Sequence, residues 1–282
     1  MNLVIQHPAL SDATVDTLAS RLGTGAARRA PGYARWAGVS LTREAVAELG
    51  EELRVDAGLV PPGQRLEDHR LIVFDMDSTL ITIECVDEIA DFVGKKAEVA
   101  AITEAAMRGE IKDYKESLRR RVALLEGLEE SALARVYDER LRLTNGAETL
   151  INAAKAAGLK VLLVSGGFTF FTGRLAPRLG IDFTRSNELE VRDGRLTGRL
   201  LGDIVDSHGK RETVLETCAQ IGCTPAQAIV VGDGANDLEM MRVAGVSVAF
   251  HAKPVVRAQT TYGLNHCGLD AIVRLFSDAA GW

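Results

Sequence analysis

The chain has 282 residues, of which 46% are hydrophobic and 26% charged, and its formal net charge is −6. These proportions are typical of a soluble globular protein with one large domain or a domain and an appendage. The negative charge argues against a nucleic acid or an anionic membrane as partner. No apolar run approaches the length of a membrane span, and no basic segment precedes an apolar one at the start, so we expect no signal peptide.

The cysteines indicate the compartment. The four of them show no CxxC pair and no zinc-ligand spacing (Cys85, Cys218, Cys223 and Cys267). We therefore expect free thiols in a reducing environment and a cytoplasmic protein.

Residues 1–68 read as a small accessory α/β region. Residues 3–5 are predicted to form a short strand, and a helix is expected from Asp12 to Leu22 with Ser11 or Asp12 as its N-cap. A glycine- and alanine-rich stretch follows, and residues 42–55 predict a second helix. Two prolines and a glycine then mark a linker at residues 61–67.

After residue 69 the pattern changes to strands that alternate with helices. The predicted strands are short, aliphatic and not alternating, which is typical of a parallel sheet covered on both faces. They lie at residues 71–75, 160–165, 228–233 and 246–250, and the helices at 147–157, 169–179, 210–221 and 236–243. Asp193-Gly194 between alternating residues predicts a hairpin.

One segment interrupts this alternation. Residues 84–143 hold about four amphipathic helical stretches and no convincing strand, so we predict a helical cap domain inserted after the first core strand. The catalytic core is then residues 69–83 and 144–282. The predicted fold class is α/β, with a Rossmann-like parallel sheet, an inserted helical cap and the small N-terminal region.

Polar residues gather where three of the predicted strands end. Because ligands of open α/β sheets bind outside the carboxyl ends of the strands, we expect these groups to meet in one crevice. They are Asp75 and Asp77, Ser165 with Gly166 and Gly167, and Asp233 to Asp237. Crowded carboxylates repel one another unless a cation is present, and an all-oxygen site of this kind suits Mg²⁺.

A phosphate group fits the same inventory. Ser165 and the backbone amides beside Gly166 and Gly167 can donate hydrogen bonds to phosphate oxygens, and Lys210 begins a helix whose start reaches the same edge. An anionic nucleophile, a second carboxylic acid, a metal, a serine and a lysine together indicate phosphoryl transfer.

Four motifs stand in the order found in the haloacid dehalogenase superfamily of phosphohydrolases. They are DMDST (75–79), VSGG with Ser165, Lys210 and GDGAND (232–237). Further segments are similar to those of the phosphoserine phosphatases within that superfamily, and the resemblance covers roughly residues 70–280: ECVDEIA (84–90), AMRGE (106–110), SLRRRVALLEG (117–127), SGGFTFF (165–171), GDIVD (202–206) and HAKP (251–254). Residues 1–68 stand where bacterial members carry an accessory region, which is ACT-like in some, and they are short for an intact ACT domain.

The resemblance implies a covalent mechanism. Asp75 attacks phosphorus, and Asp77 protonates the leaving alkoxide and then activates water. Mg²⁺ binds Asp75, the backbone carbonyl of Asp77 and Asp233. Ser165 and Lys210 hold the phosphoryl group, and Gly166 belongs to the same phosphate-binding turn.

The resemblance also implies how the substrate is selected. Glu84 takes the substrate ammonium and Arg121 its carboxylate, while Met107 packs over the substrate. Asn236 contacts the phosphate region, and Asp237 orients Lys210 or the metal waters. The implied activity is the hydrolysis of O-phospho-L-serine, the last step of L-serine synthesis, with no macromolecular partner and with a homodimer left open.

Other interpretations remain at this stage. DMDST alone also fits a strand-end turn, Glu84 fits a helix-dipole interaction, and the adjacent Arg119 and Arg120 compete with Arg121. No EF-hand or Walker A spacing is present. Alternative functions are a phosphatase or phosphotransferase for another small phosphomonoester, such as homoserine phosphate, and a non-catalytic amino-acid-binding regulator.

Overall fold

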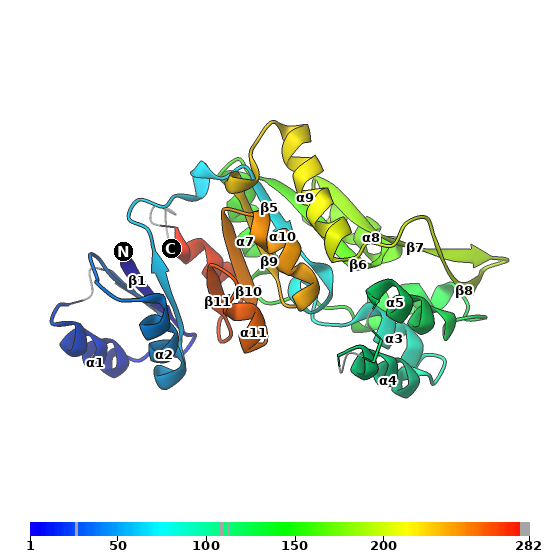
Figure 1. The fold of residues 1–282 in the computed structure, drawn as a ribbon, viewed down its shortest axis with the longest axis horizontal. Helices are drawn as coiled ribbons and strands as arrows, with labels where there is room; N and C mark the ends of the chain where they lie inside the picture. Colours follow the sequence, from blue (N-terminus) through cyan, green and yellow to red (C-terminus); the bar gives the residue numbers. More distant parts are fainter. Residues whose placement is uncertain (26–27, 108–109, 112, 277–282) are drawn as a thin grey trace. The chain divides into compact units, whose positions relative to one another are not determined.

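The computed structural model describes residues 1–25, 28–107, 110–111 and 113–276 (Figure 1). Its contacts divide the chain into two compact units. One unit holds Met1–Ile72, Asn145–Lys160 and Cys223–Trp282, and the other holds Val73–Thr144 and Val161–Gly222. Within the first unit, residues 1–68 therefore pack with part of the predicted core instead of standing apart from it.

The N-terminal region is a complete βαββαβ arrangement in 60 residues. Its elements are β1 (Asn2–Gln6), α1 (Asp12–Leu22), β2 (Arg28–Ala30), β3 (Tyr33–Trp36), α2 (Arg43–Leu53) and β4 (Asp56–Val60), and the strand order is β2-β3-β1-β4. This is the split βαβ topology of ferredoxin-like domains. The strand at residues 3–5 and both helices are confirmed, whereas β2, β3 and β4 were not predicted.

Local capping explains where the two N-terminal helices begin. The Ser11 hydroxyl accepts from the N–H of Thr14 and starts α1, and the Thr42 hydroxyl accepts from Ala45 and starts α2. The apolar faces of both helices cover one face of the sheet around the fully buried Trp36. Ser11 is thus the N-cap, which settles the alternative left open with Asp12.

The core sheet has seven strands in the order β11-β10-β9-β5-β6-β7-β8. They are β5 (Leu71–Phe74), β6 (Lys160–Phe168), β7 (Phe183–Arg192), β8 (Arg195–Leu201), β9 (Ala228–Gly232), β10 (Val246–Phe250) and β11 (Tyr262–Leu264). The pairs β10–β11, β9–β10 and β6–β7 are parallel. The antiparallel pair β7–β8 is the hairpin predicted at Asp193-Gly194, with both residues at positive φ.

Helices flank these strands as the alternating pattern predicts. They are α7 (Ala147–Ala156), α8 (Thr169–Leu179), α9 (Ser207–Ile221), α10 (Leu238–Val243) and the short α11 (Pro254–Arg257). Short helical turns complete the connections: Leu66–Asp68, Met76–Leu80, Pro225–Gln227, Ala235–Asp237 and Leu269–Leu275. Among the described residues, none of the helices combines the length and the apolar character needed to cross a membrane.

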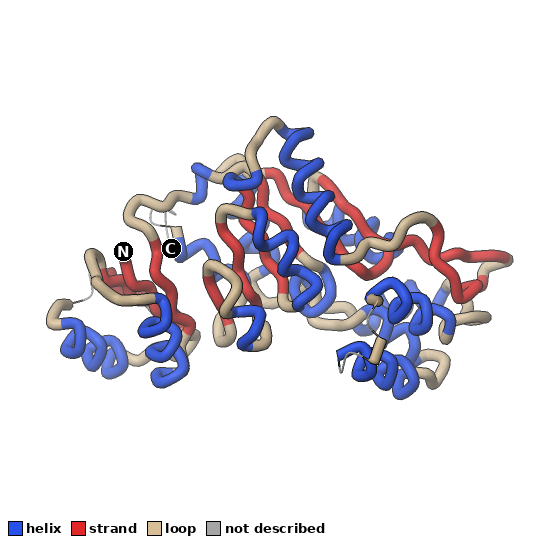
Figure 2. Tube along the Cα trace, in the orientation of Figure 1, coloured by secondary structure: helices blue, strands red, loops and turns tan. Residues whose placement is uncertain are grey.

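The segment after β5 is helical, as predicted (Figure 2). It contains α3 (Cys85–Asp91), α4 (Lys96–Met107), α5 (Tyr114–Ala123), α6 (Ser131–Arg135) and a last turn at Val136–Arg140. The hairpin holds this segment through main-chain hydrogen bonds: the N–H of Gly127 donates to the Leu196 carbonyl, and the N–H of Leu196 donates to the Leu128 carbonyl, both at 2.8 Å. The cap is therefore joined to the sheet by backbone pairing as well as by side chains.

Candidate active site

A buried ion pair stands at the end of β5. Asp75 follows the strand and is 4% exposed, and its Oδ1 accepts from Lys210 Nζ at 2.7 Å. Lys210 is 1% exposed and lies in the first turn of α9, which begins where the Asp206 carboxylate accepts from the N–H of Gly209. Burying two charges is favourable only when they are paired. The geometry thus presents an anionic oxygen held and neutralised by one ammonium.

Asp77 has a different environment from Asp75. Its Oδ1 is buried without a hydrogen-bond partner among the described residues. Burial, and then the negative charge of Glu84, raise the pKa of Asp77 to about 8, while a hydrogen bond with Cys85 opposes the rise. Two carboxyl groups two residues apart are therefore set for different work, one ionised beside Lys210 and the other protonated at neutral pH.

The turn at the end of β6 approaches the Asp77 carboxyl group. A Cβ atom added to Gly167 would lie 2.9 Å from Asp77 Oδ2 and 3.1 Å from Ser165 Oγ, so glycine allows this contact. The Ser165 side chain is buried, and its Oγ accepts from the N–H of Gly167 at 2.8 Å. The glycines in the sequence predict that the amides beside Gly166 and Gly167 are available for phosphate. The Gly167 amide is instead occupied, because the serine hydroxyl folds back onto its own turn.

Asn187 fixes this turn, although it belongs to none of the sequence motifs described above. Its Nδ2 donates to the Gly166 carbonyl and its Oδ1 accepts from the N–H of Val205, both at 2.8 Å. The side chain is 2% exposed, so both hydrogen bonds are shielded from water. No sequence signal marks an asparagine in a strand as a brace between two loops.

The cap supplies one negatively and one positively charged side chain, those of Glu84 and Arg121. Glu84 Oε1 accepts from the Ser78 hydroxyl at 2.6 Å, and Ser78 holds the positive φ of 56° that the sharp turn after Asp75 requires. Loss of solvent raises the pKa of Glu84, whereas the Ser78 hydrogen bond and the charge of Arg121 lower it. The guanidinium of Arg121 is thus close enough to Glu84 to act on its charge.

The three consecutive arginines differ in their surroundings. Arg119 and Arg120 are exposed, and Arg120 pairs with Glu116 at 2.7 Å along the outer face of α5. Arg121 is half-buried, its Nε lies 3.5 Å from the Ser117 carbonyl, and its charge also acts on Asp87 and Tyr114. The structure therefore brings Arg121, and not its neighbours, toward Glu84.

Tyr114 is a second residue beside this turn that the sequence motifs did not single out. A Cβ atom added to Gly166 would lie 2.0 Å from the Tyr114 hydroxyl oxygen, so the first residue of α5 stands directly over the turn at the end of β6. Burial raises the pKa of Tyr114, and the charges of Lys210 and Arg121 lower it. A signal did exist, because Tyr114 precedes Arg121 by seven residues and so shares its helix face.

The last motif forms a tight turn after β9. Asp237 is fully buried, and its Oδ2 accepts from the N–H of Gly234 at 3.0 Å. A Cβ atom on Gly232 would lie 2.5 Å from Asp237 Oδ2, and one on Gly234 would lie 2.1 Å from Asn236 Oδ1. Glycine at position 232 therefore leaves room for the buried Asp237 carboxyl group.

Three carboxylates form a group that can hold a metal ion. One oxygen from each of Asp75, Asp233 and Asp237 lies within 4.8 Å of the others. All the donor atoms are oxygens. Because three neighbouring carboxylates repel one another unless a cation is present, the set fits a hard divalent ion. The Asp77 carboxylate is not in this group, and the use of its backbone carbonyl stays a prediction. Met107 ends α4, but its side chain lies outside what the structure describes.

Comparisons with known proteins identify the family. A family model described as haloacid dehalogenase-like hydrolase matches residues 72–242. A curated protein from Polaromonas sp. (strain JS666 / ATCC BAA-500), named phosphoserine phosphatase, is 63% identical over 218 residues, which are 76% of this chain and 92% of that relative.

Solved structures give the same result. A HAD family hydrolase from Salmonella enterica subsp. enterica serovar Typhi has a TM-score of 0.89 and 32% identity, and the match covers 99% of each chain, including the N-terminal region. A phospho-aspartyl intermediate analogue of phosphoserine phosphatase has a TM-score of 0.69 and 36% identity, over 74% of this chain and 99% of that one.

Proposed function

The chain belongs to the haloacid dehalogenase-like hydrolases, and from that premise we propose that it hydrolyses O-phospho-L-serine to L-serine and phosphate. The observation that carries the proposal is that Glu84 and Arg121 lie close enough for the charge of Arg121 to act on Glu84, while Asp75 and Lys210 form a buried ion pair. The named relative and the phospho-aspartyl analogue support the same substrate and a covalent intermediate.

The first step is attack by a carboxylate on phosphorus. Asp75 Oδ forms the new bond to phosphorus while the bond from phosphorus to the serine oxygen breaks. Lys210 holds the nucleophile and reduces the repulsion between the carboxylate and the phosphate. Asp77 carries a proton at neutral pH, because its pKa is about 8, and gives it to the departing serine oxygen.

The second step reverses the role of Asp77. After losing its proton it is a carboxylate and takes a proton from the water that attacks the aspartyl-phosphate. The bond between Asp75 and phosphorus breaks, phosphate leaves, and Asp77 is protonated again for the next cycle. Ser165, which lies with Asp77 at the Gly167 turn, donates a hydrogen bond to the phosphoryl oxygens in each step.

We propose Mg²⁺ as the ion for the carboxylate group. Asp75, Asp233 and the Asp77 carbonyl would hold it, with Asp237 at the same group. When bound, the ion supplies charge neutralisation for the phosphoryl oxygens. The protein's own contribution is a set of oxygen donors fixed by β5 and by the glycine-containing turn after β9.

Two cap residues account for selectivity. Phosphoserine carries an ammonium and a carboxylate, and Glu84 and Arg121 offer one complementary charge for each. Tyr114 on the same helix face closes the space over the phosphate-binding turn. A non-catalytic regulator would have no use for a paired nucleophile and a protonated acid in the same crevice. Four free thiols agree with the proposed cytoplasmic location, and a homodimer stays a prediction for sedimentation to test.

The test is phosphate release from a panel of phosphomonoesters with Mg²⁺ present. We expect phosphoserine to have the highest kcat/KM, ahead of homoserine phosphate, phosphothreonine and phosphoethanolamine, and Asp75→Asn to release no phosphate. A higher kcat/KM for homoserine phosphate would favour the second candidate, another small phosphomonoester, because the same cap charges would then serve a longer substrate.

A further inference from the structure

An ion pair joins the cap to the start of the helix that carries Lys210. Lys115, the second residue of α5, places its Nζ 3.1 Å from Oδ2 of Asp206. A lysine in the first turn of a helix opposes the helix dipole, so α5 itself gains nothing from it. Asp206 ends the segment GDIVD (202–206), to which the reaction described above gives no role. We call this contact the cap–core ion pair.

The Asp206 carboxylate serves two elements at once. Its Oδ1 accepts from the N–H of Gly209 at 2.8 Å and caps α9, while its Oδ2 faces Lys115. Burial raises the pKa of Asp206, but the hydrogen bonds from Gly209 and Lys115 bring it below its ordinary value. The N–H of Lys210 donates to the Asp206 carbonyl at 2.8 Å, so the carboxylate lies one helical turn before the catalytic lysine.

The loop that carries Asp206 is itself held in place. Asn187 Oδ1 accepts from the N–H of Val205, and Asn187 Nδ2 donates to the Gly166 carbonyl, both at 2.8 Å. Asn187 and Val205 are both buried, so water does not compete for these hydrogen bonds. Asp206 and the turn at the end of β6 therefore form one fixed surface for α5 to rest on.

The start of α5 carries residues that face this surface. The hydroxyl of Tyr114, the neighbour of Lys115, lies over Gly166. Arg121 follows Tyr114 by seven residues on the same face of the helix, and its charge acts on Glu84. A shift of the start of α5 would therefore move both of the groups that the cap offers to a substrate.

Other links between cap and core are main-chain hydrogen bonds. The N–H of Thr82 donates to the Arg142 carbonyl at 2.9 Å, and the N–H of Gly127 donates to the Leu196 carbonyl at 2.8 Å. The cap–core ion pair is instead made by two side chains that are 39% and 23% exposed. Such a contact can break and form again without disturbing a helix or a strand.

We propose that Lys115 and Asp206 are positioning residues, whose ion pair holds the start of α5 against the start of α9 so that the substrate-facing residues of α5 stay over the catalytic turn. Neither side chain acts on the reacting atoms. The inference rests on the proposed function for its substrate, whereas the ion pair belongs to the fold and can be tested without turnover.

The kinetic test compares phosphoserine hydrolysis by the wild type, Lys115→Met and Asp206→Asn. Methionine keeps an apolar stem without the ammonium, and asparagine keeps the N-cap of α9 without the charge. We expect each variant to lower kcat/KM about two- to fivefold, as is usual for an exposed ion pair, through a higher KM. The kcat should stay near that of the wild type because the Asp75–Lys210 ion pair is unchanged. Lys115→Arg should keep the wild-type KM.

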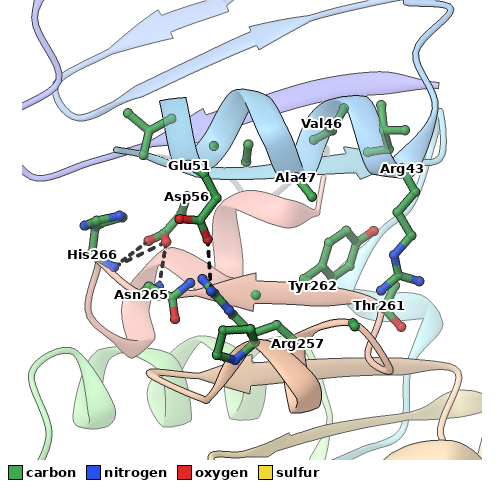
Figure 3. A pocket seen from close by; sticks show the side chains of 18 of the residues that line it. Arg43, Val46, Ala47, Glu51, Asp56, Arg257, Thr261, Tyr262, Asn265 and His266 are labelled. Atoms are coloured by element: carbon green, nitrogen blue, oxygen red, sulfur yellow. Dashed lines mark hydrogen bonds and ion pairs between the residues drawn. The ribbon is translucent and has the colours of Figure 1, made fainter. Parts of the chain in front are cut away.

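Three comparisons identify the ion pair as the cause. The double variant should be no worse than either single variant, because the second substitution has no interaction left to remove. The difference between the wild type and Lys115→Met should shrink near 1 M salt, where the screening length is about 3 Å. Glu51→Gln breaks an ion pair of similar length, 2.9 Å to Arg257, between α2 and α11 (Figure 3), and should leave KM unchanged.

Hydrogen exchange of the substrate-free chain, measured by mass spectrometry, tests the ion pair without turnover. We expect the peptide that contains α5 to exchange faster in Lys115→Met than in the wild type or Glu51→Gln. Unchanged exchange in this peptide would overturn the proposal. So would a lower kcat with an unchanged KM in Asp206→Asn, which would mean that Asp206 acts through Lys210. If the wild type does not hydrolyse phosphoserine, the proposed function fails, and the exchange result still decides the role of the ion pair.

Discussion

Asp77 links catalysis to stability through its proton. Its pKa is about 8 in the folded protein and near 3.8 without the fold, so the folded state binds a proton that the unfolded state has released between these values. The contribution of Asp77 to the stability of the wild type therefore falls as pH rises from about 4 to about 8. Asp77→Asn removes this titration, and its stability should not fall in the same way.

We therefore expect metal-free Asp77→Asn to unfold at a higher temperature than the wild type at pH 8, with a smaller difference at pH 4. The effect at pH 8 is on the order of a few kcal/mol. Asp193→Asn, at the exposed hairpin tip, is the matched control and should show no pH-dependent difference. The measurement is thermal denaturation with a chelator present. A difference in unfolding temperature between Asp77→Asn and the wild type that stays constant from pH 4 to pH 8 would contradict the burial of an uncompensated carboxyl group.

Arg121 tests substrate selection. Arg121→Lys replaces a planar fork by a point charge, so kcat/KM for phosphoserine should fall roughly 10- to 100-fold. Phosphoethanolamine has no carboxylate, and its slow hydrolysis should change little. The measured quantity is the ratio of the two kcat/KM values. Arg120→Lys, on the exposed face of α5, should keep the wild-type ratio. Equal losses for both substrates would mean that Arg121 does not bind the carboxylate.

Residues with a distinctive motif could be selected from the sequence, and their supporting residues could not. The structure brings Asp75 and Lys210 into contact and groups Asp75 with Asp233, as the motif order predicts. Tyr114 and Asn187 were missed because each acts through a contact made only in the folded chain. A single tyrosine in a helix and a single asparagine in a strand carry no pattern of their own.

At the scale of elements, α5 and the end of β6 meet at one point. Alanine at position 166 would place its Cβ 2.0 Å from the Tyr114 hydroxyl oxygen, so Gly166→Ala should push the cap helix away from the turn. We expect kcat/KM to fall by at least about tenfold, because overpacking of this kind typically destabilises by ~1–3 kcal/mol. Steady-state kinetics with phosphoserine measures the loss.

A second substitution provides the control for this prediction. Tyr114→Phe removes the clashing hydroxyl and leaves Cζ as the nearest atom, at 3.2 Å, so the double variant should recover much of the loss. Gly173→Ala in α8 has no atom within 4 Å of the added Cβ and should be neutral. If the double variant is no better than Gly166→Ala alone, the hydroxyl is not the cause of the loss.

Elements with a strong period were predictable, and short edge strands were not. The predicted strand at 246–250 and helix at 169–179 match β10 and α8. By contrast β2 has three exposed residues within a glycine- and alanine-rich stretch, and β11 has only three residues. Such segments become strands because a neighbouring strand offers its hydrogen bonds, and a one-dimensional pattern does not contain that information.

At the scale of the whole molecule, Asp56 ties the N-terminal region to the loop after β11. Removing its carboxylate leaves the backbone N–H groups of three consecutive residues without their acceptor, so Asp56→Ala should lose about 2–3 kcal/mol of stability, seen as a lower midpoint of unfolding. Its kcat at saturating phosphoserine should stay near that of the wild type, since no catalytic residue contacts Asp56. Asp16→Ala, in an exposed ion pair, is the control and should change stability by less than about 1 kcal/mol.

This tie also explains why residues 1–72 share a compact unit with the end of the chain, while the predicted division into domains stays a prediction. The pattern placed a boundary near residue 68, where two prolines and a glycine mark a linker. In the structure, residues 1–72 cluster with 223–282, because Asp56 and Gly58 receive the loop after β11 and the Tyr262 ring. Contacts between segments about 200 residues apart leave no local signal.

The central claim is that Asp75 carries the phosphoryl group during turnover. The most direct measurement is mass spectrometry of the peptide that contains Asp75, after the chain has reacted with phosphoserine and Mg²⁺ and been quenched in acid. Asp77→Asn, which retains the nucleophile but not the proton donor and acceptor, should accumulate this species slowly, and Asp75→Asn should not form it. We predict one added phosphoryl group on Asp75. Phosphate release at the wild-type rate by Asp75→Asn, or a phosphoryl group found on another residue, would contradict the account.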